Sequence, residues 1–432
     1  MVSGEEPTRL FDDLLFPKIF RTFRVAIQPT KLIIAFLAVV VICLAGWVMD
    51  LGKTVMVGTY GPAEVTELDI YINSLDDSGS ATRAHIDKYQ DEGDRAGVFS
   101  TLWRFGSAKF HAALRELFDL NFTSVGENLR DCCRALTWAF RYHCLYCLIF
   151  VTITLAVISI AGGALCRIAA LQFAQGEKPG LTEAVRFSVK RFKSLFTAPL
   201  APIGIMLFMG LFIFLLGLAG NIPLVGELIV ALGTPLALID GALMAVVLIG
   251  AVAGFGLMFP AVAYDGSDCF DSISRSFSYV YAQPSRMVCY TVLAAVYGAI
   301  CYVFVRFFAL LMLWITRCLL QLGIWTDSGT KGVGKLAAIW PRPEFMRFLA
   351  SSEPAAVTWA ELVASRLVYL VVLMVVAVLV SFIISFYFSA NTIIYSLLRN
   401  RVDKTALNDV CTHFDEADIE TSATDLQPSQ EQ

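Results

Sequence analysis

Two charged residues stand in or beside long apolar runs of the sequence. Asp240 lies within the apolar run of residues 235–259, and Arg306 directly follows the run of residues 288–305. A charge inside a bilayer costs about 2.5–3.5 kcal/mol on insertion scales, so it needs a partner and marks a candidate functional site. We predict that Asp240 and Arg306 form an intramembrane polar pair. A structural ion pair is the favoured interpretation, a proton or cation relay is the alternative, and Glu227 could join either.

A second group with chemical potential consists of Cys132, Cys133, His143, Cys144 and Cys147. His143 and Cys147 are four residues apart and share one helical face, so the group offers two or three of the ligands that a metal ion needs. The haem-attachment order is Cys-x-x-Cys-His, whereas here the histidine comes first. We favour helix packing over a metal or redox site, with a disulfide on an oxidising side as a further option. The sequence predicts no metal and no cofactor.

Motifs of catalysis are missing from the sequence. It contains no phosphate-binding Walker loop, no G-x-S-x-G elbow, no H-E-x-x-H and no paired carboxylates. We therefore predict that the protein is not an enzyme.

The composition indicates a membrane protein. Of the 432 residues, 57% are hydrophobic and 16% charged, and the mean hydropathy is +0.67. Soluble domains average about 45–50% apolar and about 25% charged residues. The net charge of −4 is small, and no basic patch interleaved with aromatic residues indicates nucleic-acid binding.

The elements that must position these residues are long apolar helices. Six runs qualify as spans, at residues 32–48, 148–165, 203–219, 235–259, 288–305 and 367–384. We interpret the first run, residues 32–48, as a signal anchor that is not cleaved. The apolar residues 224–232 are too few to cross and form either a re-entrant segment or the slanted start of the next helix. The helical pattern after residue 305 continues, so we expect that helix to leave the membrane and pack against residues 98–120.

We predict an all-α helical bundle with about six transmembrane helices, amphipathic cytoplasmic elbows and a small outer helical cap. Residues 10–27 are amphipathic and basic, and lie either on the membrane surface or against the protein itself. The expected segments are a cytoplasmic amphipathic start (1–31), a span (32–49), an acidic extracytoplasmic cap (50–140), a transmembrane core with two elbows (141–305), an extracytoplasmic extension and loop (306–364), a span (365–398) and an acidic cytoplasmic tail (399–432).

Basic residues set the expected orientation. They cluster before the first span, between the second and third, and after the sixth, whereas residues 50–120 are acidic. Because lysine and arginine favour the cytoplasmic side, we predict an inner-membrane protein with both termini in the cytoplasm.

The two elbows, residues 181–195 and 271–287, loosely repeat one another: a capping residue, an arginine, a Phe-Ser pair and a proline before the next span. This residue pattern resembles that of the glycerophosphodiester-phosphodiesterase-type membrane domain of bacterial multi-span proteins. The ending TIIYSLLRNRVD, residues 392–403, is similar to that of uncharacterised bacterial membrane proteins. The resemblance implies a polytopic membrane fold. The soluble phosphodiesterase barrel has no counterpart here, so no activity and no functional residues carry over.

These observations favour a non-catalytic integral membrane protein, a scaffold or accessory subunit of a membrane assembly. Its expected partners are the lipid bilayer and other membrane-protein subunits, not nucleic acid. A transporter or lipid-handling permease that uses Asp240 and Arg306 is one alternative. A metal or redox subunit that uses His143 and Cys147 is another.

Overall fold

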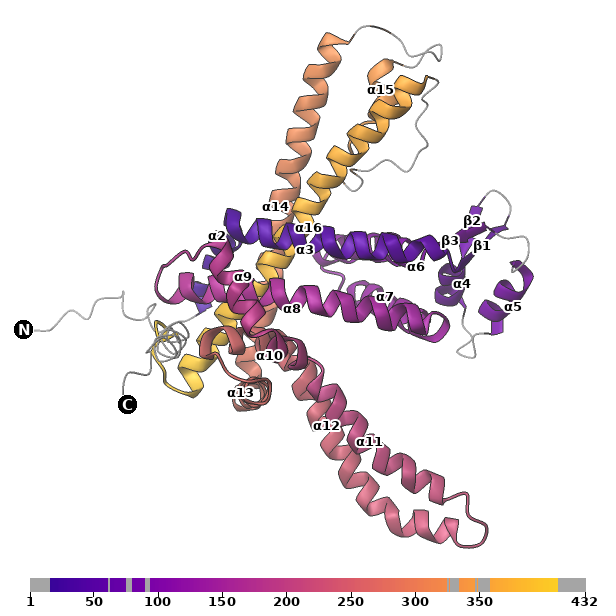
Figure 1. Ribbon diagram of the computed structural model, residues 1–432, viewed down its shortest axis with the longest axis vertical. Coiled ribbons are helices and arrows are strands. Elements are labelled where there is room, and N and C mark those ends of the chain that lie inside the picture. The colour runs from indigo at the N-terminus through magenta and orange to yellow at the C-terminus, as the bar shows by residue number, and fades with distance from the viewer. Residues whose placement is uncertain are drawn as a thin grey trace, which may run out of the picture. The chain divides into compact units, whose positions relative to one another are not determined.

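The computed structural model describes residues 16–60, 63–74, 80–89, 94–324, 326, 334–345, 348 and 358–410. Within these ranges, six helices are long and apolar enough to cross a membrane (Figure 1). They are α3 (Pro29–Met49), α8 (Cys144–Ala174), α11 (Ala201–Ala219), α12 (Gly226–Asp265), α14 (Pro284–Gly323) and α16 (Trp359–Val402). The predicted class, a mostly helical protein with six candidate spans, is confirmed.

The chain divides into two compact units. Unit 1 comprises Met1–Phe36, Ile158–Val305 and Val378–Gln432, and unit 2 comprises Leu37–Val157 and Arg306–Ala377. Each of α3, α8, α14 and α16 therefore contributes residues to both units.

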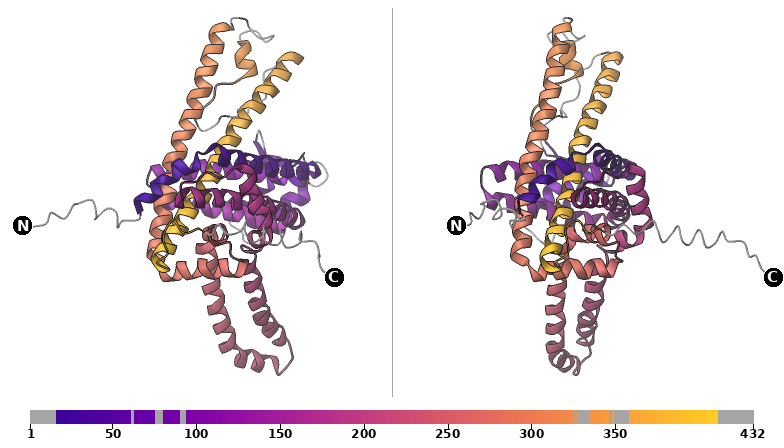
Figure 2. Two further views of the ribbon diagram at one scale, coloured as in Figure 1. Left: turned by 60° about the vertical axis from the view of Figure 1, so that its left-hand side comes forward. Right: turned by 90° about the vertical axis from the view of Figure 1, so that its left-hand side faces the viewer.

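Unit 1 contains the short elbow helices as well as the apolar hairpin. The first elbow is α9 (Leu181–Lys190) with α10 (Phe192–Thr197), and the second is α13 (Cys269–Ala282). The α11 and α12 helices lie side by side as an antiparallel hairpin, as Figures 1 and 2 show. Residues 226–232 belong to α12, which continues without a break, as the alternative that they begin the next helix predicts.

Glycines allow close packing in unit 1, as the pair at residues 162 and 163 predicts. A Cβ atom on Gly162 would lie 2.5 Å from the ring of Phe388, and one on Gly163 would lie 2.4 Å from Leu195. Since real Cβ contacts are never this short, α8 can pack here only without side chains at these positions.

The N-terminal basic segment packs on unit 1. Its described part forms η1 (Phe16–Arg21) and α2 (Thr22–Ala26), and residues 10–15 lie outside the described residues. Ile19 and Ala26 are fully buried. The ring of Phe23 meets Phe304 and Phe382 edge-on at 6.4 and 6.0 Å. Of the two expected placements, packing against the protein itself is the one this apolar face adopts.

Unit 2 contains a small mixed domain. Strands β1 (Val55–Tyr60), β2 (Ala63–Thr66) and β3 (Asp94–Ala96) form an antiparallel sheet in the order β2-β1-β3. The helices α4 (Glu67–Asn73), α5 (Ser80–Tyr89), α6 (Val98–Phe118), α7 (Phe122–Tyr142) and α15 (Lys335–Ile339) and the turn η2 (Asp50–Gly52) complete the regular elements of this unit in the described ranges.

The sheet departs from the sequence-based expectation. The sequence predicted a helical cap at residues 50–140 of an all-α protein, yet Val57 pairs with both Thr66 and Asp94 in a sheet. The polar residues 73–97 contain α5 and β3. Pairing between short strands depends on residues distant in the chain, so the local residue pattern of a short polar segment does not predict it. The α6 helix continues through Gly106 without a break.

Side-chain hydrogen bonds join the ends of these elements. The Asp50 carboxylate accepts hydrogen bonds from the amides of Phe99 (2.9 Å) and Ser100 (2.8 Å), which satisfies the first turn of α6. Lys109 and Asp131 form a 2.7 Å ion pair between α6 and α7. The two helices are thus held as a hairpin.

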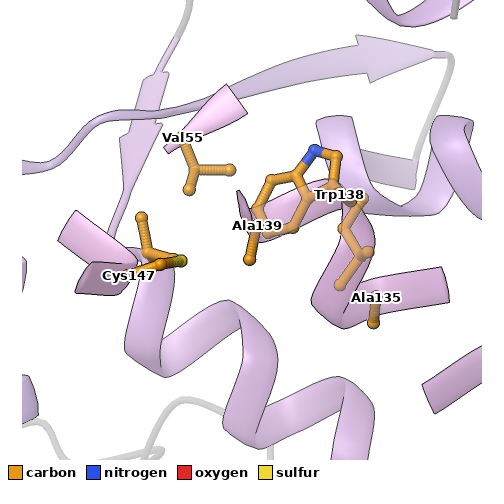
Figure 3. Close-up of a cluster of buried hydrophobic side chains, with 7 residues drawn as sticks. Val55, Ala135, Trp138, Ala139 and Cys147 are labelled. Atoms are coloured by element: carbon orange, nitrogen blue, oxygen red, sulfur yellow. The ribbon is translucent and has the colours of Figure 1, made fainter. Parts of the chain in front are cut away.

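The core of this domain is apolar and lies between α7, α8 and the sheet. Trp138 is fully buried, and Val55, Ala135, Ala139 and Cys147 surround it (Figure 3). Packing of one large ring among small side chains fixes the joint between α7 and α8.

Candidate functional site

The last long helix, α16, carries a row of hydroxyl side chains buried inside unit 1. Their spacing of three or four residues places them on one helical face, and the row consists of Ser381, Ser385, Ser389, Thr392 and Ser396. All are at most 3% exposed. The Ser385 hydroxyl donates to the carbonyl of Ala26 at 2.7 Å, between two different helices. Small polar side chains of this kind let membrane helices approach closely and supply hydrogen bonds there.

A lysine is completely buried against this row. The amine of Lys31, on α3, donates to Ser389 Oγ at 3.2 Å. The Cys166 thiol of α8 interacts with Lys31 electrostatically and hydrogen-bonds to Thr392. A neutral hydroxyl compensates only part of the cost of removing an ammonium group from water. An ionisable group in such a place is a functional-site candidate.

At the end of the same helix lies a cluster of compensated charges, which we call the Asp265 network. The Asp265 carboxylate pairs with Arg399 (3.1 Å) and Arg275 (3.1 Å) and accepts a hydrogen bond from the Tyr395 hydroxyl (2.5 Å). The Asp265 side chain is 8% exposed and that of Arg399 is 11% exposed. Arg275 also pairs with Asp271 at 3.1 Å. The network joins the ends of α12, α13 and α16.

Two tyrosines extend this network towards the end of the described chain. The rings of Tyr279 and Tyr395 lie 5.4 Å apart, and the Tyr279 hydroxyl donates to the Asp403 carboxylate. Burial, with this hydrogen bond, raises the pKa of Tyr279 above its ordinary value. Tyr279 therefore stays protonated and remains a donor throughout the neutral range.

Arg167 ties the first elbow to the same region. Its guanidinium donates to the carbonyl of Ala263 at 3.0 Å and lies 4.9 Å from the ring of Phe187 on α9. Arg167 thus connects α8, α9 and α12, and the Asp265 network connects α12, α13 and α16. Polar contacts of this kind fix the positions of the helices relative to one another within unit 1.

The two residues predicted to form an intramembrane pair fall in different compact units, so the pairing stays a prediction. Asp240 lies on α12, and its Oδ2 atom is shielded from solvent without a hydrogen-bond partner in the described structure. Arg306 is 5% exposed and donates to the Phe345 carbonyl and to His111 Nε2, both at 2.7 Å. The contact between Arg306 and His111 joins α14 to α6, as the expected packing of the helix extension against residues 98–120 requires.

The imidazole of His111 accepts the hydrogen bond from Arg306 and must therefore be unprotonated at Nε2. Burial and the neighbouring Arg306 charge lower the pKa of His111 from 6.5 to about 4. The rings of Phe345 and Phe348 lie 5.5 and 4.7 Å from the Arg306 guanidinium and complete its environment.

The cysteine and histidine group does not converge on one point. Cys147 is buried in the apolar core, whereas Cys133 and Cys144 are exposed, and all ten cysteines among the described residues are free thiols. Within the described ranges, no three His, Cys, Asp or Glu side chains are arranged to hold a metal ion.

His143 instead faces an acidic residue that the sequence analysis did not single out. Its Nε2 lies 3.6 Å from Glu67 Oε2, and Glu67 Oε1 accepts the Met56 amide at 2.5 Å. The Glu67 side chain is 2% exposed. The pair lies beside Trp138, whose ring centroid is 5.1 Å from that of His143.

Sequence reasoning missed the hydroxyl row, Lys31 and the Asp265 network. Lys31 was counted among the basic residues that precede the first span, although α3 begins two residues earlier, at Pro29. The four-residue spacing of Ser381, Ser385 and Ser389 inside an apolar run was the signal that could have shown a buried polar face.

The fold and these sites define a multi-pass helical membrane protein. Comparison with models of known protein families, with curated proteins and with solved structures finds no match to this chain. The similarity to glycerophosphodiester-phosphodiesterase-type membrane domains is not supported by any of them.

Proposed function

We propose that the protein is a non-catalytic scaffold or accessory subunit of a membrane assembly. The observation that carries this proposal is the α11–α12 hairpin of unit 1, which is apolar on all sides. Only 6% of the most apolar stretch of α11 is buried. Large side chains such as Leu207, Phe214 and Leu238 are 71%, 65% and 69% exposed. A helix that is hydrophobic all round needs lipid or other helices around it.

Asp240 makes lipid alone an unfavourable environment for this hairpin. A carboxylate facing hydrocarbon costs about 2.5–3.5 kcal/mol, and such residues in membrane helices usually pair with another polar group. Asp240 is partly exposed, and its shielded Oδ2 atom has no hydrogen-bond partner in the described structure, so we infer that a basic or hydroxyl side chain on a helix of another subunit pairs with the exposed part of this carboxylate. The proposed partner is therefore a membrane protein with a donor at that depth.

The test compares Asp240→Asn with Glu227→Gln. Both changes remove one negative charge from the same hairpin, and Glu227 is exposed at its turn. The full chain is extracted in mild detergent, and its size is measured by native electrophoresis and light scattering. We expect a larger assembly for the natural protein and for Glu227→Gln, and its loss in Asp240→Asn. A lone monomer in all three, or equal assemblies in all three, would contradict the proposal.

Lys31 favours a second candidate, a transporter or lipid-handling protein. Its full burial beside Ser389 gives unit 1 an ionisable group that could exchange a proton or pair with an anion. In proteoliposomes, Lys31→Met should abolish ion or lipid movement while the folded state stays at least as stable, because methionine removes the desolvation cost. Flux equal to that of the natural protein would remove this candidate.

The metal or redox role through His143 and Cys147 stays a prediction, and elemental analysis of the purified protein tests it. We also propose the bacterial inner membrane as the location, with both termini in the cytoplasm, which the distribution of basic residues supports. Reporter fusions at each terminus would contradict this orientation if they labelled the outer side.

A further inference from the structure

The first elbow presents three exposed basic side chains, two on α9 and one, Lys193, on the following α10. Arg186, Lys190 and Lys193 follow at spacings of four and three residues, and all three are exposed, as is Val189 between them. The opposite face of α9 is buried through Ala184 and Ser188. The exposed face, which we call the α9 basic face, therefore combines three cations with an apolar side chain.

This face lies close in the chain to a candidate membrane span. The α10 helix ends at Thr197, and the apolar α11 begins at Ala201. Lys193 is thus about two helical turns before the first residue of the span. Basic residues directly beside a span lie where the headgroups of the bilayer begin.

The second elbow provides an internal contrast. The exposed positions of α13 include Phe270, Asp271, Ser274, Ser278 and Tyr281, none of which is basic, and the exposed base of this elbow is Arg286 at the start of α14. Its arginine, Arg275, is occupied by Asp265 and Asp271. Exposed acidic residues near the α9 basic face include Glu183, one turn before Arg186, and Asp268, whose carboxylate lies 3.9 Å from Arg191. The three basic residues of the face together with Arg191 outnumber these two carboxylates, so the surface is net positive.

We propose that the α9 basic face binds the phosphate headgroups of anionic lipids. Charge complementarity selects an anionic surface, and the exposed Val189 with the adjoining span selects a bilayer over a soluble acidic partner. An amphipathic helix with basic residues beside an apolar one lies in the plane of the membrane interface in this way. The proposal is independent of whether the α11–α12 hairpin meets another subunit.

The test measures lipid selectivity of the purified full chain. Protein in micelles that contain equal amounts of phosphatidylglycerol and phosphatidylcholine is analysed by native mass spectrometry, and the ratio of the two bound lipids is recorded. The first variant replaces the three basic residues of the face, and the control removes the same charge from exposed positions of unit 2. The changes are R186Q, K190Q and K193Q in the first variant and R83Q, K88Q and R115Q in the control.

We expect the natural protein and the control to prefer phosphatidylglycerol. Each basic residue near a lipid surface strengthens binding by about fivefold, so the face variant should lose selectivity by on the order of 100-fold. If that variant fails to fold, Lys193→Gln alone should lose about fivefold, while Arg186→Lys, which keeps the charge, should retain the preference. An unchanged lipid ratio in the face variant, or an equal loss in the control, would overturn the proposal.

Discussion

Replacing Asp265 by asparagine should destabilise unit 1 far more than replacing its exposed neighbour Asp271. Asparagine keeps the shape of the side chain but removes the charge between Arg399 and Arg275 and turns an acceptor into a donor. Arg399, whose side chain is only 11% exposed, would then lose the more buried of its two carboxylate partners and keep Asp409, which lies 3.4 Å away and is 61% exposed. Because an exposed carboxylate compensates a buried cation only weakly, most of the desolvation cost of Arg399 would stay uncompensated.

The expected size of the effect follows from the burial of each pair. Breaking a buried ion pair costs about 3–5 kcal/mol. The pair with Arg275, which is 38% exposed, is screened by solvent and adds at most about 1 kcal/mol. We therefore expect a loss of about 4 kcal/mol, which is a roughly thousandfold change in the ratio of folded to unfolded protein.

The assay is unfolding in mixed micelles, with increasing amounts of a denaturing detergent and far-ultraviolet circular dichroism as the signal. Asp271→Asn is the matched control, because it breaks a pair with the same Arg275 in which the carboxylate is 49% exposed. It should cost less than about 1 kcal/mol. Equal losses in the two variants, or a loss below about 1 kcal/mol for Asp265→Asn, would refute the argument that burial of this network stabilises the fold.

Three further predictions concern packing and pH. Gly162→Ala should destabilise unit 1, because the added Cβ atom would lie 2.5 Å from the ring of Phe388. Gly241→Ala adds a Cβ atom with nothing within 4 Å and should stabilise its helix by up to about 1 kcal/mol. Thermal unfolding of both variants checks this. Trp138→Ala should cost about 3–5 kcal/mol of unfolding free energy, since the ring is 0% exposed. Burial and the adjacent guanidinium lower the pKa of His111 from 6.5 to about 4 in the folded protein. Between pH 4 and pH 6.5 the unfolded chain therefore binds a proton at His111 more readily than the folded chain does. Stability should therefore fall as the pH drops from 6.5 towards 4, and unfolding measured across that range should show this fall in the natural protein but less of it in His111→Gln.

The long spans were predictable because each is a continuous apolar run, and such a run has few alternatives to a membrane helix. The first elbow was predictable for a similar reason, since basic and apolar residues alternate at helical spacing in α9. The extension of α14 beyond residue 305 also followed from periodicity alone. Each of these features depends on residues that are near one another in the chain.

The polar interior was not predictable in this way. Lys31 and Ser389 are separated by most of the chain, and Asp265 and Arg399 lie on helices far apart in sequence. In the sequence, Lys31 resembles the other basic residues that precede the first span, and Arg399 resembles the other basic residues that follow the sixth span. Their burial depends on which helices pack against them, and no local pattern records that.

The amino-acid sequence alone thus determined where the apolar helices are and which segments between them are polar, because hydrocarbon length and helical periodicity are local properties. The tertiary structure decided which polar groups are buried together: a lysine with a row of hydroxyls, an aspartate with two arginines, and a histidine with a glutamate. The physical reason is that the desolvation of a charge and its compensation by a partner depend on distances between residues remote in the chain, and folding alone sets those distances.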